Sequence, residues 1–162
     1  MSKLFVDEIQ PKTTGGIITS NPNRPSFLAH RYTSGLQSLA TQTNEIVEFN
    51  ETDYNTGGHY NASNYTFTCP VSGLYHFDHW LYVYTTSQTN TRLYINGVSK
   101  YRFASIGVPS AQNPHGAGGG ISIKLNSNDT VKLYVWSASA NANIYAGATG
   151  ERASFFSGYL IG

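Results

Sequence analysis

The feature that most constrains the fold is the run from Gly73 to Thr86, in which both faces of the expected strand are rich in large apolar and aromatic side chains. Aromatic and β-branched residues are typical of strands, and alternate strand residues point to opposite faces of a sheet. One face carries residues such as Tyr75 and Phe77, and the other carries Trp80 and Tyr82. A sandwich buries only one face of each sheet, and each exposed side chain of this kind forgoes roughly 1.5–3 kcal/mol of burial. We therefore expect the chain to self-associate through this sheet, and the alternative is that a loop or the N-terminal segment covers it.

The rest of the chain favours an all-β sandwich. Helical periodicity is nearly absent, and short runs rich in Tyr, Val, Ile, Phe and Thr are separated by Gly, Asn, Pro and Ser. The pair Asn96-Gly97 between two such runs is a strong hairpin signal. Besides the long run, strands are expected at residues 26–32, 45–50, 65–68, 91–97, 99–106, 120–125, 130–136 and 153–162.

The segments between these strands suggest how the chain is divided. Residues 1–25 form an N-terminal arm, with two short strands at 4–9 and 16–19 and a Pro-containing linker at 21–25. Residues 26–162 form the main domain. Surface contacts usually come from loops, which we expect at residues 35–44, 50–58 and 107–119. Tyr54 and His59 are the first candidates for contact with a receptor, although Tyr54 could equally pack under its own loop.

Charge excludes several classes of partner. Only 12% of the residues are charged, the net charge is +1, and no basic stripe is visible, so nucleic acid is not expected as a partner. No apolar run reaches the length of about 18 residues that a membrane-spanning helix needs. A surface of Tyr, Ser, Thr, Asn and Gly suits contact with carbohydrate or protein, and equally suits any long-lived extracellular β-protein.

No pattern of catalytic residues can be argued. The single cysteine, Cys69, lies in an apolar run without an adjacent basic residue, so a small buried hydrophobe is favoured over a catalytic thiol. The glycine triplet at 118–120 is not followed by Lys-Ser or Lys-Thr, so it is no phosphate-binding loop. His76 and Asp78 share a strand face, and copies around an axis could gather a metal ion or an anion. A hydrogen-bonded polar layer in a subunit interface is the favoured alternative.

Several motifs in register resemble a known family. The run FTCPVSGLYHF (67–77) is similar to the globular head of complement component one-q, a member of the tumour-necrosis-factor-like jelly rolls. NTGGHYN (55–61) resembles the Asn-x-Gly-Gly-x-Tyr turn of that family, and LYING (93–97) resembles its Leu-x-x-Asn-Gly hairpin. The paired strands at 118–136, IYAG (144–147) and SFFSGYLIG (154–162) complete a match over about residues 26–162, although Asn128 stands where the family has Gly.

The resemblance implies a ten-stranded jelly-roll β-sandwich that assembles as a homotrimer around an aromatic axis. Phe67, Tyr75 and Phe77 would then lie in the core. The candidates for the trimer interface are His76, Asp78, Trp80, Tyr82 and Tyr159. Family members can bind calcium near one end of the trimer, but Asp53 and Asp129 lie in no dense acidic loop and Asp commonly caps turns. We therefore predict no metal site and no cofactor.

The N-terminal segment suggests a setting for the trimer. KLFVDEIQPKTTGGIIT (3–19) resembles short segments found near domains of phage tail fibres and other virion proteins. The prediction is a non-enzymatic virion component, a fibre knob for host-surface attachment, joined through residues 1–25 to other virion proteins. Two alternatives stay open: a purely structural trimer that caps a fibre, and a secreted bacterial domain that binds carbohydrate or protein.

Overall fold

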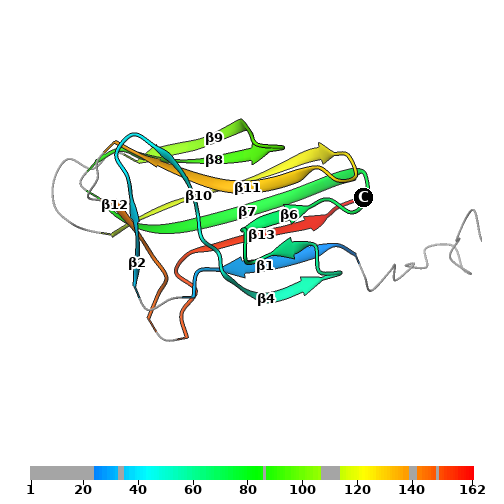
Figure 1. Ribbon diagram of the computed structural model, residues 1–162, viewed down its shortest axis with the longest axis horizontal. Helices are drawn as coiled ribbons and strands as arrows, with labels where there is room; N and C mark the ends of the chain where they lie inside the picture. The colour runs from blue at the N-terminus through cyan, green and yellow to red at the C-terminus, as the bar shows by residue number, and fades with distance from the viewer. Residues whose placement is uncertain (1–23, 33–34, 86, 107–113, 139–141, 149) are drawn as a thin grey trace, which may run out of the picture.

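The chain folds into two packed β-sheets. The computed structural model describes residues 24–32, 35–85, 87–106, 114–138, 142–148 and 150–162. The predicted N-terminal arm, apart from residues 24 and 25, lies outside the described residues. Most strands run along the long axis of the molecule, and β1 begins at the same end at which the C-terminus lies (Figure 1). Backbone hydrogen bonds at this end run from the Leu160 amide to the Pro25 carbonyl at 3.0 Å, from the Leu74 amide to the Gly162 carbonyl at 2.7 Å, and from the Ile161 amide to the Leu74 carbonyl at 2.7 Å.

The seven-stranded sheet is built around β7. β10 pairs with β7 along its full length on one side, whereas β13 and β12 pair with successive parts of β7 on the other side. β1 continues the sheet from β13, β4 lies beyond β1, and β2 lies beyond β12. Its strands are β1 (Ser26–His30), β2 (Leu36–Leu39), β4 (Glu51–Thr56), β7 (Gly73–Tyr84), β10 (Pro114–Leu125), β12 (Ala142–Tyr145) and β13 (Phe155–Leu160).

The six-stranded sheet packs against the first and is built around β11. β8 lies on one side of β11 and β9 lies beyond β8, whereas β6 and β3 pair with other parts of β11. Its strands are β3 (Asn44–Ile46), β5 (Tyr60–Asn61), β6 (Thr66–Thr68), β8 (Thr89–Ile95), β9 (Val98–Ile106) and β11 (Thr130–Ser137). The predicted hairpin is confirmed: Asn96 and Gly97 both have positive φ, 51° and 77°, between β8 and β9.

The expected strand number and three of the expected loops were wrong. The described residues form 13 strands rather than ten. β2 lies within the predicted loop 35–44, β4 lies within 50–58, and β10 begins at Pro114, inside the predicted loop 107–119, whose residues 107–113 lie outside the described part. β2 and β4 are edge strands without apolar alternation: the buried positions of β2 are Gln37 and Leu39, and β4 is mostly polar with no fully buried residue. The start of β10 is rich in glycine, which carries no side chain from which a period could be read.

The core between the sheets is aromatic. Phe27 is fully buried, and its ring lies 4.7 Å from the ring of Tyr60, 5.2 Å from that of Phe67 and 5.2 Å from that of Phe156, measured between centroids. Phe67, Tyr75 and Phe77 are buried, as predicted from the resemblance. Aromatic pairs of this kind add about 0.5–1.5 kcal/mol beyond their area burial, so this cluster anchors the sandwich.

Two sequence predictions concern residues next to this core, and both are confirmed. Cys69 is completely buried, its thiol donates to the Val71 carbonyl at 3.0 Å, and burial raises its pKa, as expected for a packing residue. The Asn55 side chain bonds both backbone groups of Tyr60, at 2.7 and 3.0 Å, and so closes the Asn-x-Gly-Gly-x-Tyr turn.

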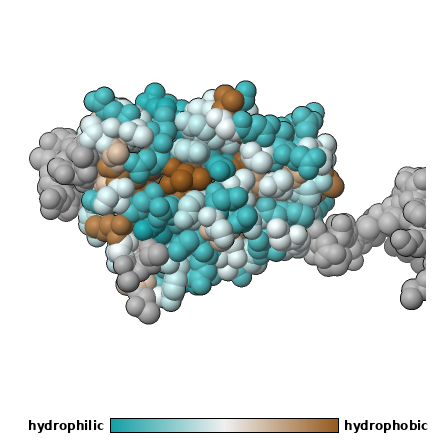
Figure 2. All heavy atoms as spheres, viewed as in Figure 1, coloured by the Kyte–Doolittle hydropathy of each residue, from teal (hydrophilic) through white to brown (hydrophobic). Residues whose placement is uncertain are grey.

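The surface in view is predominantly hydrophilic. Figure 2 shows hydrophobic residues there as small, separate patches within polar surface. Among the described residues, no helix is long and apolar enough to cross a membrane.

Candidate functional site

Three exposed aromatic side chains, Tyr54, Trp80 and Tyr159, lie on the side of the seven-stranded sheet that faces away from the core. Odd-numbered residues of β7 are buried from Tyr75 to Val83, so the even-numbered residues point outward. Two of the exposed aromatics on this side are Trp80 and Tyr159, with 45% and 46% of their surface accessible. We refer to this side as the aromatic face, and its members on β7, β12 and β13 are His76, Asp78, Trp80, Tyr82, Tyr84, Tyr145, Phe155 and Tyr159.

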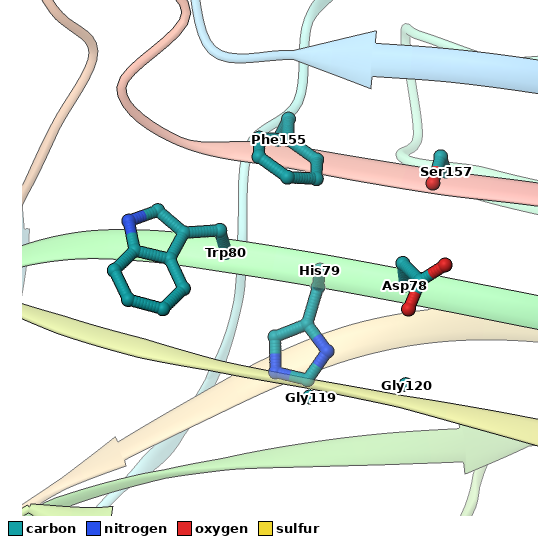
Figure 3. A pocket seen from close by; sticks show the side chains of 7 residues that line it. All are labelled: Asp78, His79, Trp80, Gly119, Gly120, Phe155 and Ser157. Carbon is teal, nitrogen blue, oxygen red and sulfur yellow. The ribbon is translucent and has the colours of Figure 1, made fainter.

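Trp80 lies at the middle of the aromatic face because β10 leaves room for it. Phe155 on β13 and Gly118 on β10 are its direct cross-strand partners. A Cβ atom at Gly116 or Gly118 would overlap the Trp80 indole, so the glycines allow the ring to lie against the β10 backbone. The ring borders an open hollow of about 620 Å³ (Figure 3). The hollow is lined by Asp78, His79, Trp80, Gly119, Gly120, Phe155 and Ser157.

A polar pair lies beside the hollow. The His76 Nε2 atom is 2.8 Å from an Asp78 carboxylate oxygen, and the His76 Nδ1 atom is 2.8 Å from the Ser122 hydroxyl on β10. The carboxylate lies over Gly120, where a Cβ would overlap it. The Tyr159 ring lies 5.5 Å from the imidazole. The pair therefore has hydrogen-bond partners within one chain, so it could be buried against another surface without being left unpaired.

A tyrosine cluster extends the aromatic face toward β12. Tyr82, Tyr84 and Tyr145 have ring centroids 5.7 to 5.9 Å apart, in tilted and edge-on arrangements. All three rings are partly exposed. The cluster presents apolar ring surface together with hydroxyl groups, as is common in protein interfaces.

The five predicted interface residues, His76, Asp78, Trp80, Tyr82 and Tyr159, all lie on this one face. Period-2 alternation along β7 was enough to bring four of them together, and register with β13 adds Tyr159 opposite His76. Phe155, Tyr84 and Tyr145 also belong to this face but were not among the predicted interface residues. Alternation within the predicted strands 73–86 and 153–162 could have indicated Tyr84 and Phe155, whereas Tyr145 lies outside every predicted strand.

Tyr54 and His59 do not lie in one contact loop. Tyr54 belongs to the edge strand β4, is 48% exposed, and pairs with Leu28 on the outward side of the same sheet. His59 follows β4 in a turn, is half-buried, and its ring occupies the space that a Cβ at Gly57 would need. Tyr54 therefore continues the sheet face that carries Trp80, whereas His59 belongs to the turn closed by Asn55.

Directly behind the aromatic face lies a buried histidine. His79 is 5% exposed and points away from Trp80 and Asp78 (Figure 3). Its Nε2 atom lies 2.7 Å from the Thr91 hydroxyl on β8, so it connects the two sheets, and the Phe103 ring packs against it at 4.6 Å. Burial lowers the pKa of His79 from 6.5 to about 4, while a hydrogen bond to the Gly119 backbone and the charge of Asp78 partly oppose that shift. His79 is consequently neutral at pH 7.

The two aspartates considered as calcium ligands have other partners. Asp129 accepts hydrogen bonds from the Asn96 side chain at 2.7 Å and from the Asn126 amide at 2.8 Å, which lower its pKa. Asp53 forms an ion pair with Arg152 at 2.9 Å, and this contact lowers the pKa of its carboxyl. Within the described ranges, His, Cys, Asp and Glu form no group of three or more that could hold a metal ion.

Comparison of the sequence with known proteins gives one consistent result. Residues 27–161 match the C1q domain. A complement C1q subcomponent of Mus musculus is 35% identical over 143 residues, which cover 81% of this chain and 53% of that protein. Complement C1q tumor necrosis factor-related protein 2 of Homo sapiens is 31% identical over 117 residues, covering 71% of this chain and 38% of that protein. The chain thus spans about half the length, or less, of these relatives.

Solved structures agree at the level of the fold. The globular domain of zebrafish complement 1qA protein superposes with a TM-score of 0.63 at 19% identity, covering 86% of this chain and 98% of that one. Murine APRIL, crystallised at pH 5.0, superposes with a TM-score of 0.64 at 12% identity, covering 85% of this chain and 99% of that one. The two-sheet sandwich and its strand connections are therefore those of a known jelly roll.

Proposed function

The chain belongs to the C1q domain family, and from this premise we propose that it is a non-enzymatic homotrimer whose protomers associate through the aromatic face. C1q-like and tumour-necrosis-factor-like domains form homotrimers, and members of these families are ligand-binding and structural proteins. The observation that carries the proposal is the exposure of Trp80 and Tyr159 in one chain, on a sheet whose other side already forms the core. Closed cyclic symmetry lets one patch of each copy be buried without leaving a free edge.

The polar groups of the aromatic face are compatible with burial in such an interface. His76 is held between Asp78 and Ser122, so removing water from it leaves its ring nitrogens bonded. Asp78 also lies directly opposite Ser157 on β13. The pair would then form a polar layer within an apolar interface and fix the register of the copies. A metal ion or anion gathered at the axis by His76 and Asp78 is the alternative.

The test is the mass of the purified chain in solution, measured by light scattering with and without a chelator. We expect about three times 17.7 kDa in both conditions. A mass of 17.7 kDa without chelator would contradict the trimer. A trimer that is lost only with chelator would replace the polar layer by a metal at the axis, while leaving the association itself in place.

For the setting of this trimer we propose a virion fibre, in which the domain forms a knob used for attachment to the host surface. The supporting observation is the resemblance of residues 3–19 to segments found near phage tail-fibre domains. Tyr54, exposed on β4, remains a candidate contact in this role, as does His59. Three identical sites acting together would raise avidity by orders of magnitude over one site.

Mass spectrometry can test the setting directly. Particles purified on a density gradient and the particle-free culture medium would both be searched for peptides of this chain. We expect the peptides in the particle fraction. Their presence only in the particle-free medium would contradict the virion proposal and favour the secreted binding domain, without affecting the trimer. If particles contain the chain but an excess of free trimer does not compete with their adsorption, the structural capping role is favoured over attachment.

A further inference from the structure

The outward side of the six-stranded sheet carries a different set of residues. Alternate positions of β8 and β11 point away from the core. Tyr94 and Tyr134 lie diagonally across these strands with ring centroids only 4.1 Å apart. The Arg92 guanidinium lies over the Trp136 ring, 6.0 Å from its centroid. All four side chains are partly exposed, so this stripe of rings and arginine is open to solvent in the single chain.

Cations on this side stand next to one another without carboxylates. Arg92 on β8 is the direct cross-strand partner of Arg102 on β9, and Lys132 on β11 is the partner of Tyr94. The sequences of β8, β9 and β11 contain neither Asp nor Glu. Like charges directly opposite one another in a sheet are destabilising. Two guanidinium groups at one cross-strand position therefore form a site at which an anion would relieve repulsion.

Two arginines elsewhere in the molecule form ion pairs with carboxylates. Arg31 has a Glu48 carboxylate oxygen at 2.9 Å, and Arg152 has an Asp53 carboxylate oxygen at 2.9 Å. In the parts of the chain that the structure describes, no ion pair is formed by Arg92, Arg102 or Lys132. Arg92 and Arg102 thus stand without a carboxylate partner among the described residues, on the face that also carries the exposed rings.

Arg92 is also oriented in advance. Its Nε atom donates to the Asn90 side-chain oxygen at 2.9 Å, and its guanidinium plane is supported by Trp136. A guanidinium fixed in this way loses less conformational freedom when it forms a two-point contact with a carboxylate or sulfate. Its terminal nitrogens donate to no acceptor among the described residues, so they remain available to a ligand.

We propose that this side of the six-stranded sheet, through Arg92, Arg102, Lys132, Tyr94, Tyr134 and Trp136, binds an acidic polysaccharide. The guanidinium groups pair with carboxylate or sulfate groups, and the rings pack against the apolar faces of the sugars. A nucleic acid fits less well, because the net charge of the chain is only +1 and the cations form one short cluster rather than a track for a phosphate backbone. The site lies on the sheet opposite the aromatic face, so each protomer would present it whether or not the chains form a trimer.

The probes are an oligogalacturonate, a sulfated dextran and an unmodified dextran of similar length, with single-stranded DNA as a fourth ligand. Calorimetry on the full chain measures each affinity at low and at physiological salt. We expect binding of an acidic glycan that weakens with salt, and no binding of unmodified dextran. The comparison of oligogalacturonate with sulfated dextran identifies the preferred acidic group. Equal binding of neutral and acidic glycans, no binding of either acidic glycan, or tighter binding of DNA than of both would overturn the proposal.

A charge-matched pair of variants locates the site. The double variant Arg92→Gln/Arg102→Gln should bind the acidic glycan at least tenfold more weakly than the parent. The control variant Arg24→Gln/Arg152→Gln removes the same charge from residues outside the six-stranded sheet and should stay within about twofold of the parent. An equal loss in both variants, or in neither, would contradict the assigned site. Light scattering on the same samples reports the oligomeric state, so failure of glycan binding and failure of the trimer are separate results.

Discussion

The outward sides of the two sheets follow the same alternation but differ in how their polar groups are satisfied. On the aromatic face, the polar pair His76–Asp78 is bonded within the chain, and Trp80 lies flat over glycines. On the opposite sheet, rings alternate with cations, and Arg92 stands opposite Arg102 without a carboxylate. Both sides expose aromatic surface, so aromatic content alone does not distinguish them.

The difference indicates what each side can be buried against. A face whose His76–Asp78 pair is bonded within the chain can meet an identical copy, because the interface adds apolar burial and leaves this pair bonded. A face with adjacent cations cannot meet its own copy in this way, since the contact would bring like charges together. The first side is therefore suited to permanent association, and the second to a ligand of opposite charge.

Placing a charge on the aromatic face should have the largest effect. In Trp80→Arg, the trimer would have to bury an unpaired guanidinium at the middle of each interface, which costs several kcal/mol. We expect the mass from light scattering to fall from about three times 17.7 kDa to 17.7 kDa. Tyr101→Arg, at a residue of β9 that is 38% exposed, is the control and should keep the mass of the parent. A trimer that survives Trp80→Arg with unchanged circular dichroism would mean that the copies meet elsewhere.

Protonation of His79, which is buried between the two sheets, should have the next largest effect: it should make the free energy of unfolding depend on pH. The folded pKa of His79 is about 4, below its ordinary value of 6.5. Between these values the unfolded chain binds a proton that the folded chain excludes, so the stability present above pH 6.5 is lost as the pH falls toward 4. A difference of one in pKa between the folded and unfolded chains corresponds to about 1.4 kcal/mol, which gives at most ~3 kcal/mol for this residue.

Urea unfolding at pH 7 and pH 4.5, at one protein concentration, measures this effect. His79→Gln removes the titrating group while keeping a side chain that can hydrogen-bond to Thr91. We expect the variant to lose less stability than the parent on acidification. His59→Gln, at a histidine outside the core, should lose as much as the parent. Identical losses in the parent and in His79→Gln would show that protonation of His79 does not limit stability.

Much of the fold could be predicted because its long strands alternate clearly. In β7, the core-side residues from Tyr75 to Val83 are large and apolar apart from His79, and the Asn96-Gly97 pair marks the β8–β9 hairpin without ambiguity. β2 and β4 could not be predicted in this way, because β2 has only four residues with a polar Gln37 at one of its two buried positions, and β4 is mostly polar with no fully buried residue. The first half of β10 could not be predicted because its glycines show no apolar period. Gly116 and Gly118 are required by the Trp80 ring of β7, which occupies the space that their Cβ atoms would need.

The aromatic face was more predictable than the cation-bearing side. The former depends on alternation within one strand, which a sequence displays directly. The latter depends on the register of β8 with β9, where irregularities on both sides of the pair set Arg92 against Arg102. Register that is shifted by bulges cannot be counted from the sequence. The alternation of Lys132, Tyr134 and Trp136 can be seen in the sequence, but the cross-strand pairing of Arg92 with Arg102 cannot.

The turn that holds this register should have an intermediate effect on stability. Asn96 has a φ of 51°, its side-chain amide donates to Asp129 at 2.7 Å, and its side-chain oxygen accepts from the Thr130 amide at 2.8 Å. Asn96→Ala would lose both hydrogen bonds and place a Cβ-bearing residue in the left-handed region, at a cost of about 2 kcal/mol. Asn96→Gly loses the same bonds without the strain and should cost about half as much. Equal costs from urea unfolding would mean that backbone strain plays no part.

The smallest effect has the opposite sign and tests the central premise of the comparison. If Arg92 and Arg102 repel each other in the free protein, then Arg102→Gln should stabilise the chain by a few tenths of a kcal/mol at low salt, because a like-charged cross-strand pair is removed. The gain should vanish at about 1 M salt, where the screening length is roughly 3 Å. Midpoints of urea unfolding at both salt concentrations measure it, and Arg24→Gln is the control that should change neither midpoint. A loss of stability in Arg102→Gln at low salt would mean that Arg102 has a stabilising partner, and the cation pair would then be no anion site. A gain in stability, with weaker glycan binding in the same variant, would mean that the Arg92–Arg102 pair destabilises the free protein and contributes to binding of the glycan.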